Sequence, residues 1–396
     1  ITGSIKNTPV RASVGYLNQN GILKTSNMDR ISTSIGVSPS FLNNSLKVDL
    51  NLKSSVINNN FANQGAIGTA VGFDPTQSVT GSDFGGYFEW LDPATKKPNS
   101  LGPKNPLGLL NLQKDQSKVN RTIANAVFDY KMPFLPELRA NANVAIDKSS
   151  SEGTINIPAG IANSFDRGGK AGTYSQSKDN KTFEFYLNYV KSIGMHRIDV
   201  MGGYSYQDFL RDNTDLDKNV AGTVFNNTYY KTQNTLVSFY GRANYSLNDK
   251  YLLTFTLRND GSSRFSPENR WGVFPSAAAA WKISEEFKDS EVISDLKLRL
   301  GWGVTGQQDV FSDYPYLARY TNSEPNAQYQ FGNTFLNTLR PEGYDANIKW
   351  EQTTTKNIGL DFGFKKVGIT GSIDVYQKET KDLLSVIPVP AGSNLT

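Results

Sequence analysis

Cysteine is absent from this 396-residue sequence, and histidine occurs only once, as His196. Without cysteine there is no disulfide framework, no thiol nucleophile and no thiolate metal site. A single histidine leaves little room for imidazole chemistry. GxSxG, HExxH and P-loop motifs are missing too, as is any paired-carboxylate constellation. We therefore expect no catalytic residue, no metal site, no cofactor and no enzymatic activity.

Long apolar runs are also missing. No segment approaches the roughly 18 to 20 apolar residues that a membrane-spanning helix needs, so the chain can span a membrane only as a closed barrel of strands. Residues 1–9 lack the basic start and apolar stretch of a signal peptide. The 41 basic and 37 acidic residues are spread along the chain, giving a net charge of +4. This pattern offers no footprint for nucleic acid.

Aromatic residues are abundant. They make up 12% of the sequence, with 19 Tyr and 22 Phe beside 34 Gly, and the mean hydropathy is −0.45. A low average hydropathy is compatible with an outer-membrane barrel, because only every second strand residue faces lipid and the lumen is polar. Aromatic girdles at the two membrane interfaces would account for the ring-bearing residues.

Apolar and polar residues alternate in segment after segment, which is the period of a two-faced β-strand. In residues 46–53, for example, four apolar side chains share one face and four polar side chains the other. The pattern recurs in residues 138–147, 182–189, 198–206, 237–245, 251–258, 296–304, 358–364 and 369–375, and more weakly in 10–18, 30–37, 122–130 and 273–283. We expect about 13 strands of roughly 9 to 14 residues, near the length that crosses a bilayer at a tilt.

The connections between these segments alternate in length. Short ones are expected at residues 43–45, 133–137, 192–196, 246–250 and 364–367, and long ones at 57–118, 149–180, 211–231 and 306–349. Short turns on one side and long loops on the other are typical of outer-membrane barrels, whose long loops lie outside the cell. A soluble β-sandwich is the structural alternative, with shorter strands and more even turns. Thirteen is a poor number for closing an antiparallel barrel, so we expect further strands outside this sequence.

Several blocks resemble the SusC/RagA family of TonB-dependent transporters. They are VGYLNQNGILKTS (14–26), NPLGLLNLQKDQSKVNR (105–121), RNDGSSRFSPENRWGVFPSAAAAWKI (258–283), LKLRLGWGVTGQ (296–307), IKWEQTTTKNIGLDF (348–362) and VYQKETKDLL (375–384). The similarity runs nearly end to end, and the blocks stand in the order found in the family. The third block is the most specific of them.

The resemblance implies an all-β fold, a transmembrane antiparallel barrel of about 22 strands in the outer membrane of a Gram-negative bacterium. It makes residues 1–396 part of one barrel domain, with the N-terminal plug and the C-terminal strands outside this sequence. It also implies import of oligosaccharides or peptides, with a SusD-like surface lipoprotein and the TonB complex as partners, the latter through the missing N-terminal region. The alternative within the family is a barrel that does not transport and acts as a scaffold in an outer-membrane complex. A soluble carbohydrate-binding or glycan-hydrolysing β-protein is the alternative from another class.

Two aromatic clusters in the long loops are the candidate ligand-binding residues. They comprise Phe84, Tyr87 and Trp90, with Phe88 and the carboxylates of Asp83, Glu89 and Asp92 nearby, and Tyr314, Tyr316, Arg319 and Tyr320 near Asn322. Aromatic faces beside carboxylates and amides suit sugar rings, which need apolar contact and directed hydrogen bonds. Packing of each loop against itself or against a partner explains the same residues equally well.

Other motif residues have simpler interpretations. The DGSS sequence of residues 260–263 favours a tight change of direction in which Gly261 takes a positive φ. An alternative places three residues of this block at the outer rim, where they face the substrate or the SusD-like lipoprotein: Arg264, Arg270 and Trp271. His196 is expected to be a solvated histidine in a short turn. Lumen-facing charges that wet the channel wall and pair with one another or with a plug are Lys47, Asp49, Lys53, Arg139, Asp147, Arg242, Arg258, Lys297, Arg299 and Asp374.

Overall fold

The computed structural model describes residues 1–287, 290–309, 312–323 and 327–387. The strands are β1 (Thr2–Ile5), β2 (Thr8–Asn20), β3 (Asn27–Val37), β4 (Ser40–Phe41), β5 (Leu46–Phe61), β6 (Lys114–Lys131), β7 (Leu138–Ile157), β8 (Lys170–Ile193), β9 (His196–Lys218), β10 (Val224–Leu247), β11 (Tyr251–Ser262), β12 (Trp271–Lys282), β13 (Ile293–Gln307), β14 (Tyr320–Asn322), β15 (Gln328–Phe331), β16 (Thr334–Asn337), β17 (Leu339–Pro341), β18 (Glu351–Phe364) and β19 (Ile369–Lys381). The helices are α1 (Gly65–Gly72) and α2 (Pro106–Leu112), and short 3-10 helices are η1 (Ala162–Ser164) and η2 (Ile283–Glu286).

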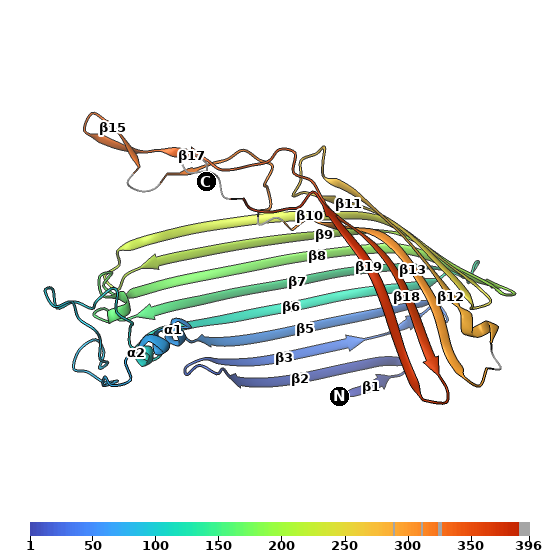
Figure 1. Cartoon of the computed structure of the whole chain (residues 1–396), viewed down its shortest axis with the longest axis horizontal. Coiled ribbons are helices and arrows are strands. Elements are labelled where there is room, and N and C mark those ends of the chain that lie inside the picture. The colour runs from blue at the N-terminus through green and yellow to red at the C-terminus, as the bar shows by residue number, and fades with distance from the viewer. Residues whose placement is uncertain (288–289, 310–311, 324–326, 388–396) are drawn as a thin grey trace.

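One antiparallel sheet of 15 strands dominates the molecule (Figure 1). Its order is β1-β2-β3-β5-β6-β7-β8-β9-β10-β11-β12-β13-β18-β19, with β4 paired to β5, so each strand lies beside its neighbour in sequence. In the described part of the chain, every strand of this sheet except the short β1 and β4 runs for at least 11 residues, which leaves thirteen long strands. All thirteen segments with an alternating pattern are confirmed as strands. The small pairs β14-β17 and β15-β16 lie in the 308–350 loop.

The central strands are longer than the sequence pattern predicts. β8 and β10 each have 24 residues, and β7 has 20. The long loops expected at 149–180 and 211–231 were therefore wrong, because only residues 158–169 and 219–223 connect these hairpins. Above the bilayer both faces of a strand meet water, so the apolar alternation ends there while the backbone pairing continues. The alternation of apolar and polar residues therefore indicates the membrane-facing part of such a strand and not its full length.

The outward face of the sheet is apolar and exposed. Phe255 and Leu257 on β11 are each 56% exposed, and Ile358 on β18 is 57% exposed. A sandwich would bury such side chains against a second sheet. Here a single sheet curls from β2 through β10 and returns in front as β12, β13, β18 and β19 (Figure 1). The soluble sandwich is therefore excluded, and the exposed apolar face is the lipid-facing surface of a transmembrane barrel.

Aromatic rings border this apolar face at both ends. At one end the rings of four strands follow one another at centroid distances of 6.3, 5.2 and 6.2 Å, in the order Phe183, Tyr204, Phe239, Trp271. At the other end Tyr251 stacks on Trp281 at 6.1 Å. Trp281 follows Trp271 after ten residue steps along β12. At about 3.3 Å per residue and a tilt of about 40°, this is roughly 25 Å of membrane, the height of the apolar band in outer-membrane barrels.

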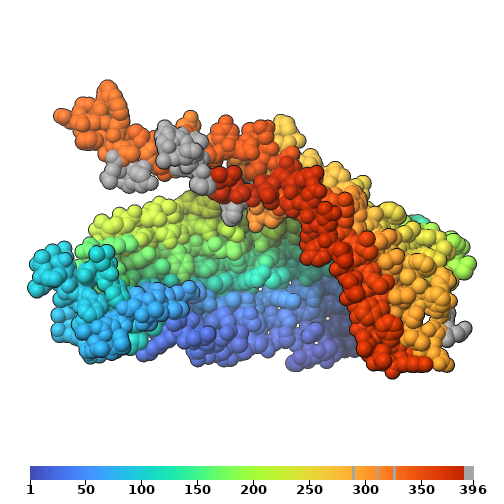
Figure 2. Space-filling view, in the orientation of Figure 1, coloured from blue at the N-terminus to red at the C-terminus, as the bar shows by residue number. Residues whose placement is uncertain are grey.

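The predicted short turns lie at the Trp281 end. The two longest connections, 62–113 and 308–350, lie at the Trp271 end, together with shorter ones such as 219–223. The 62–113 loop carries α1 and α2 and covers the end of β5 and β6, while the 308–350 loop extends along the side of β10 (Figure 1). Figure 2 shows the recessed inner face of the central strands behind β18 and β19. None of the helices in the described residues is long and apolar enough to span a membrane.

Candidate functional site

Charged side chains on the inner face of the sheet pair across strands. Arg121 makes two hydrogen bonds to Asp147, at 2.9 and 2.7 Å, and Arg139 makes two to Asp129, at 2.9 and 2.8 Å. Further round the sheet, Arg299 binds Asp361 and Asp374, with closest distances of 2.8 and 3.1 Å. These pairs compensate charge on the inner face, and the face stays polar, as expected for a hydrated channel lining.

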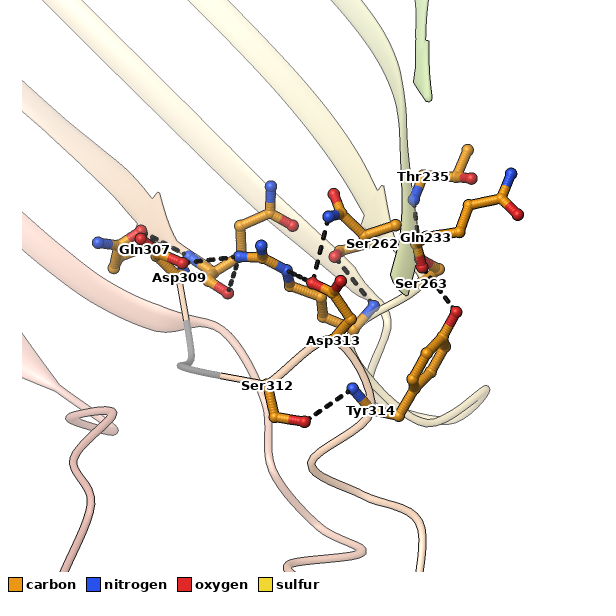
Figure 3. A network of polar contacts seen from close by, with 12 residues as sticks. Gln233, Thr235, Ser262, Ser263, Gln307, Asp309, Ser312, Asp313 and Tyr314 are labelled. Carbon is orange, nitrogen blue, oxygen red and sulfur yellow. Dashed lines mark hydrogen bonds and ion pairs between the residues drawn. The ribbon is translucent and has the colours of Figure 1, made fainter. Parts of the chain in front are cut away.

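At the loop end of the inner face, Arg264 joins the β11–β12 connection to the start of the 308–350 loop. Figure 3 shows the polar network around Asp309, Asp313 and Tyr314. The Arg264 guanidinium contacts Asp313 at 3.1 Å and Asp309 at 2.9 Å, and Asn234 of β10 donates to the same Asp313 oxygen at 3.2 Å. The Tyr314 hydroxyl donates to the backbone oxygen of Gln233 at 2.7 Å. The start of the 308–350 loop is thus held against β10 and the β11–β12 connection.

An apolar cluster lies beside this network. Phe265 is fully buried, and Phe274 and Trp350 are nearly so. The Trp350 ring lies 5.4 Å from that of Phe265 and 5.3 Å from that of Phe274, and its indole N–H donates to the backbone oxygen of Arg270 at 2.9 Å. The most specific sequence block therefore builds an anchor for the loop end of β11 and β12.

Two details of that block differ from expectation. Gly261 is a residue of β11 and does not have a positive φ, so the predicted turn at residues 260–263 was wrong. A Cβ at Gly261 would lie 2.8 Å from the Trp271 ring, so glycine is needed there for close packing and not for backbone freedom. Trp271 belongs to the outer aromatic row, whereas Arg264 lies on the inner side.

A polar cavity of about 660 Å³ opens on the inner face next to Arg264. Its lining comes from β8, β9, β10, the end of β13 and the start of the 308–350 loop, and consists of Lys178, Asn180, Phe209, Leu210, Arg211, Tyr230, Thr232, Asn234, Arg264, Gln307, Gln308, Asp309 and Asp313. It combines charges, amides and two aromatic rings, which is the chemistry of a site for a polar ligand. Only Arg264 of its residues was singled out by the sequence pattern.

The first predicted cluster is largely packed within the 62–113 loop. The Phe84 ring contacts Phe165 at 5.9 Å, and the Tyr87 hydroxyl accepts a hydrogen bond from Asn111 at 2.7 Å. Trp90 lies 5.1 Å from Phe88, edge to face. The structure thus shows contacts within the loop for Tyr87 and Trp90 and a contact with the 158–169 connection for Phe84, and ligand binding by them stays a prediction.

The second predicted cluster is dispersed. Tyr314 is tied to β10, and Arg319 pairs with Glu342 at 3.0 Å. Tyr316 is half-buried, whereas Tyr320 on β14 is 69% exposed. Of these four residues, Tyr320 presents the most open surface to a ligand or partner, and its role stays a prediction too.

Asn105 organises the 62–113 loop, although the sequence pattern did not single it out. Its side chain is fully buried, accepts hydrogen bonds from the amides of Leu107 and Gly108 at the start of α2, and donates to the backbone oxygens of Val79 and Phe88. The NP dipeptide before an apolar run is the signal of a helix start that marks it.

Two carboxyls of this loop have shifted pKa values. Burial raises the pKa of Glu89, although the Asn105 amide and Lys104 act in the opposite direction. Hydrogen bonds from the backbone amide and hydroxyl of Thr95 lower the pKa of the half-buried Asp92. His196 lies at the start of β9 and is exposed, and its Nδ1 is 2.7 Å from the Tyr245 hydroxyl.

Comparison with known proteins identifies the fold. A family model described as TonB dependent receptor-like, beta-barrel matches residues 26–396. The chain belongs to this family. Its members are outer-membrane receptors and transporters rather than enzymes, so the sheet lies in the cell outer membrane.

Relatives within the family share the whole length of the chain. TonB-dependent receptor SusC of Bacteroides thetaiotaomicron is 42% identical over 100% of the chain, and TonB-dependent receptor P3 of Formosa agariphila is 30% identical over 100%. The chain spans 42% of the length of each. The resemblance to SusC/RagA-like TonB-dependent transporters is thereby confirmed.

Solved structures show the same architecture. The RagAB peptide transporter matches 98% of the chain with a TM-score of 0.78 at 20% identity, and the chain covers 44% of it. The siderophore receptor PirA from Acinetobacter baumannii matches 96% of the chain with a TM-score of 0.55 at 13% identity, and the chain covers 48% of it. At these identities the matches establish the fold.

Proposed function

We propose that this chain is part of an outer-membrane importer that takes up oligosaccharides or peptides with energy from the TonB complex. The observation that carries the proposal is the 42% identity to SusC, which extends over all of the chain. The likeness to the fold of the RagAB peptide transporter supports it. The paired charges and the polar cavity of the inner face supply a hydrated path for a polar solute.

The partner in this proposal is a SusD-like surface lipoprotein. The 308–350 loop supports it by an apolar surface on β14 to β17, where Phe331 is 72% exposed, Tyr320 69%, Leu339 63% and Tyr329 62%. These side chains belong to the loop that leaves the sheet at the Trp271 end, where the 62–113 loop also lies. Exposed apolar patches of this kind mark protein interaction sites.

Import and the scaffold alternative are separated by uptake in living cells. The gene of the full-length protein is deleted, and accumulation of labelled oligosaccharide and labelled peptide is measured in the deletion strain, in the complemented strain and in a strain without TonB. Loss of uptake of one substrate class in both mutants, with recovery on complementation, supports import. Normal uptake in the deletion strain, together with loss of an outer-membrane complex, supports the scaffold instead.

The partner surface is tested separately. In the full-length protein, Phe331→Ser with Tyr329→Ser is expected to reduce co-purification of the lipoprotein by at least tenfold, since loss of two large apolar contacts removes about 3 kcal/mol or more. Phe255→Ser with Leu257→Ser, on the lipid-facing surface, is the matched control. Equal recovery of the lipoprotein with all variants would contradict the proposed surface.

The larger architecture is also a proposal. Because the chain spans 42% of each curated relative, we propose that it forms part of one barrel domain of about 22 strands, with an N-terminal plug and C-terminal strands contributed by residues outside this sequence. A cryo-electron microscopy structure of the full-length protein tests this. A sheet that closes without strands beyond β1 and β19 would contradict it.

A further inference from the structure

Two cations face each other on the inner wall of the polar cavity. Lys178 of β8 and Arg211 of β9 are direct partners in the strand register, and both line the cavity of about 660 Å³. Their side chains point inward, because the lipid-facing residues of β8, such as Phe183 and Phe185, have odd numbers and those of β9, such as Val200, have even numbers.

The pair lacks a carboxylate of its own. Within the described residues, no ion pair is formed by Arg211 or by Lys178. Lys178 is attracted to Asp147, but that carboxylate already makes two hydrogen bonds to Arg121. The two acids of the cavity, Asp309 and Asp313, both bind Arg264. Like charges directly opposite on neighbouring strands destabilise a sheet, and among the described residues the attraction of Lys178 to the shared Asp147 offsets this cost only in part.

The rest of the cavity offers a complementary set of groups. The side-chain oxygen of Gln308 is buried and accepts no hydrogen bond from the described residues, so it awaits an N–H or O–H donor. Phe209 and Tyr230 add ring surface to the same lining. A solute that carries one carboxylate beside hydroxyl or amide donors, with an apolar edge for the rings, would satisfy all of them.

We propose that this cavity is a subsite for a carboxylate group of the transported solute, bound by Lys178 and Arg211, with Gln308 accepting a neighbouring donor. The proposal rests on the import function and specifies its substrate chemistry. An acidic sugar and the C-terminus of a peptide both present a carboxylate beside such donors. The two sources are distinguished by the test and not by the site.

The test measures binding to the purified full-length protein by calorimetry, with two matched pairs of probes. One pair is a disaccharide with a terminal glucuronic acid and its methyl ester, and the other is tetra-alanine and its C-terminal amide. We expect at least one acid to bind about tenfold or more tightly than its neutral partner, because charge-assisted hydrogen bonds differ by about that factor in affinity. The pair that shows the preference identifies the source of the carboxylate.

Lys178→Gln with Arg211→Gln is expected to abolish the preference and to leave affinity for the neutral probes unchanged. Arg242→Gln, which removes an inward cation elsewhere on β10, is the matched control and should keep the preference. Because the double substitution removes like-charge repulsion, its thermal stability should equal or exceed that of the unsubstituted protein. Lower stability would show that a carboxylate from another part of the protein occupies the pair, and would overturn the proposal.

Two further results would overturn it. One is equal binding of acid and neutral probes in both pairs, and the other is an acid preference that survives the double substitution. If the double variant does not assemble, the unsubstituted protein decides: its preference should fall about tenfold between low and high salt, since screening weakens partly exposed charges. A preference independent of salt would contradict the site.

Import is not measured in these assays, so failure of the import proposal and failure of this subsite give different results.

Discussion

At the scale of single residues, the face on which a side chain lies determines its tolerance to charge. Phe255 points outward midway between the two aromatic borders and is 56% exposed, whereas its neighbour Thr254 points inward and donates to Asn244 at 2.9 Å. We expect Phe255→Arg to lower the free energy of unfolding by about 2 to 4 kcal/mol, because arginine near the bilayer midplane costs about that much. Thr254→Arg should cost less than 1 kcal/mol. Denaturant titration of the full-length protein in lipid vesicles measures both, and equal losses would refute the facing assignment.

Glu89 provides a second prediction at this scale. Its pKa is raised by burial, so the folded loop binds the proton more tightly than the unfolded loop does. The charged form is therefore penalised in the folded loop at neutral pH, and this penalty disappears as the pH falls through the raised pKa. We expect the 62–113 loop to exchange amide hydrogens more slowly at pH 4, below the ordinary pKa of glutamate, than at pH 7, after correction for intrinsic rates. Glu89→Gln should remove this difference; a variant that keeps it would exclude Glu89 as the cause.

At the scale of elements, the loops are held by a few buried polar groups. Asn105 caps α2 and binds two backbone oxygens, so Asn105→Ala removes a helix cap and the donor to the Phe88 oxygen, whereas the Val79 oxygen still accepts from the Phe88 amide. We expect local opening of residues 79–112 to become easier by about 2 to 4 kcal/mol. Hydrogen exchange of these residues measures the change. Asn99→Ala, which removes one exposed hydrogen bond to the Leu101 amide, is the control and should have little effect. Unchanged exchange in Asn105→Ala would show that the apolar contacts of α1 and α2 suffice.

The 308–350 loop is also held by a few polar groups. Arg264 and Tyr314 tie its beginning to the inner wall, while β14 to β17 remain exposed beyond it. One end of the loop therefore shapes the cavity, and the other presents apolar surface. Under the proposed function, this loop would connect the partner lipoprotein with the transported solute.

At the scale of the whole molecule, the sheet requires a membrane. Its outer face exposes apolar side chains between two aromatic borders, and its inner face carries paired charges. We expect the detergent-extracted full-length protein to migrate faster on SDS gels before boiling than after it, because the closed, fully paired sheet resists the detergent until heated. Identical migration in both samples, or recovery of the protein in the aqueous fraction, would contradict a barrel.

Much of the fold could be predicted from the sequence. In segments such as 46–53 and 251–258, the alternation of apolar and polar residues depends only on neighbouring residues of the same strand. All thirteen long strands and the facing of their side chains follow from it. The lengths of β7 to β10 did not, because above the membrane both strand faces meet water and the period no longer reports pairing. Gly261 shows a second limit: its role depends on the Trp271 ring, which only the pairing of β11 with β12 brings close.

The sequence by itself therefore determined where the chain crosses the membrane and which side chains meet lipid, because a two-residue period is written into each strand separately. Only the tertiary structure decided which groups form the cavity. Lys178, Arg211 and Gln308 are far apart in sequence, and they meet because antiparallel pairing and the anchoring of the 308–350 loop place three segments on one inner surface. Such long-range proximity has no local sequence pattern, so it could be found only after the chain was folded.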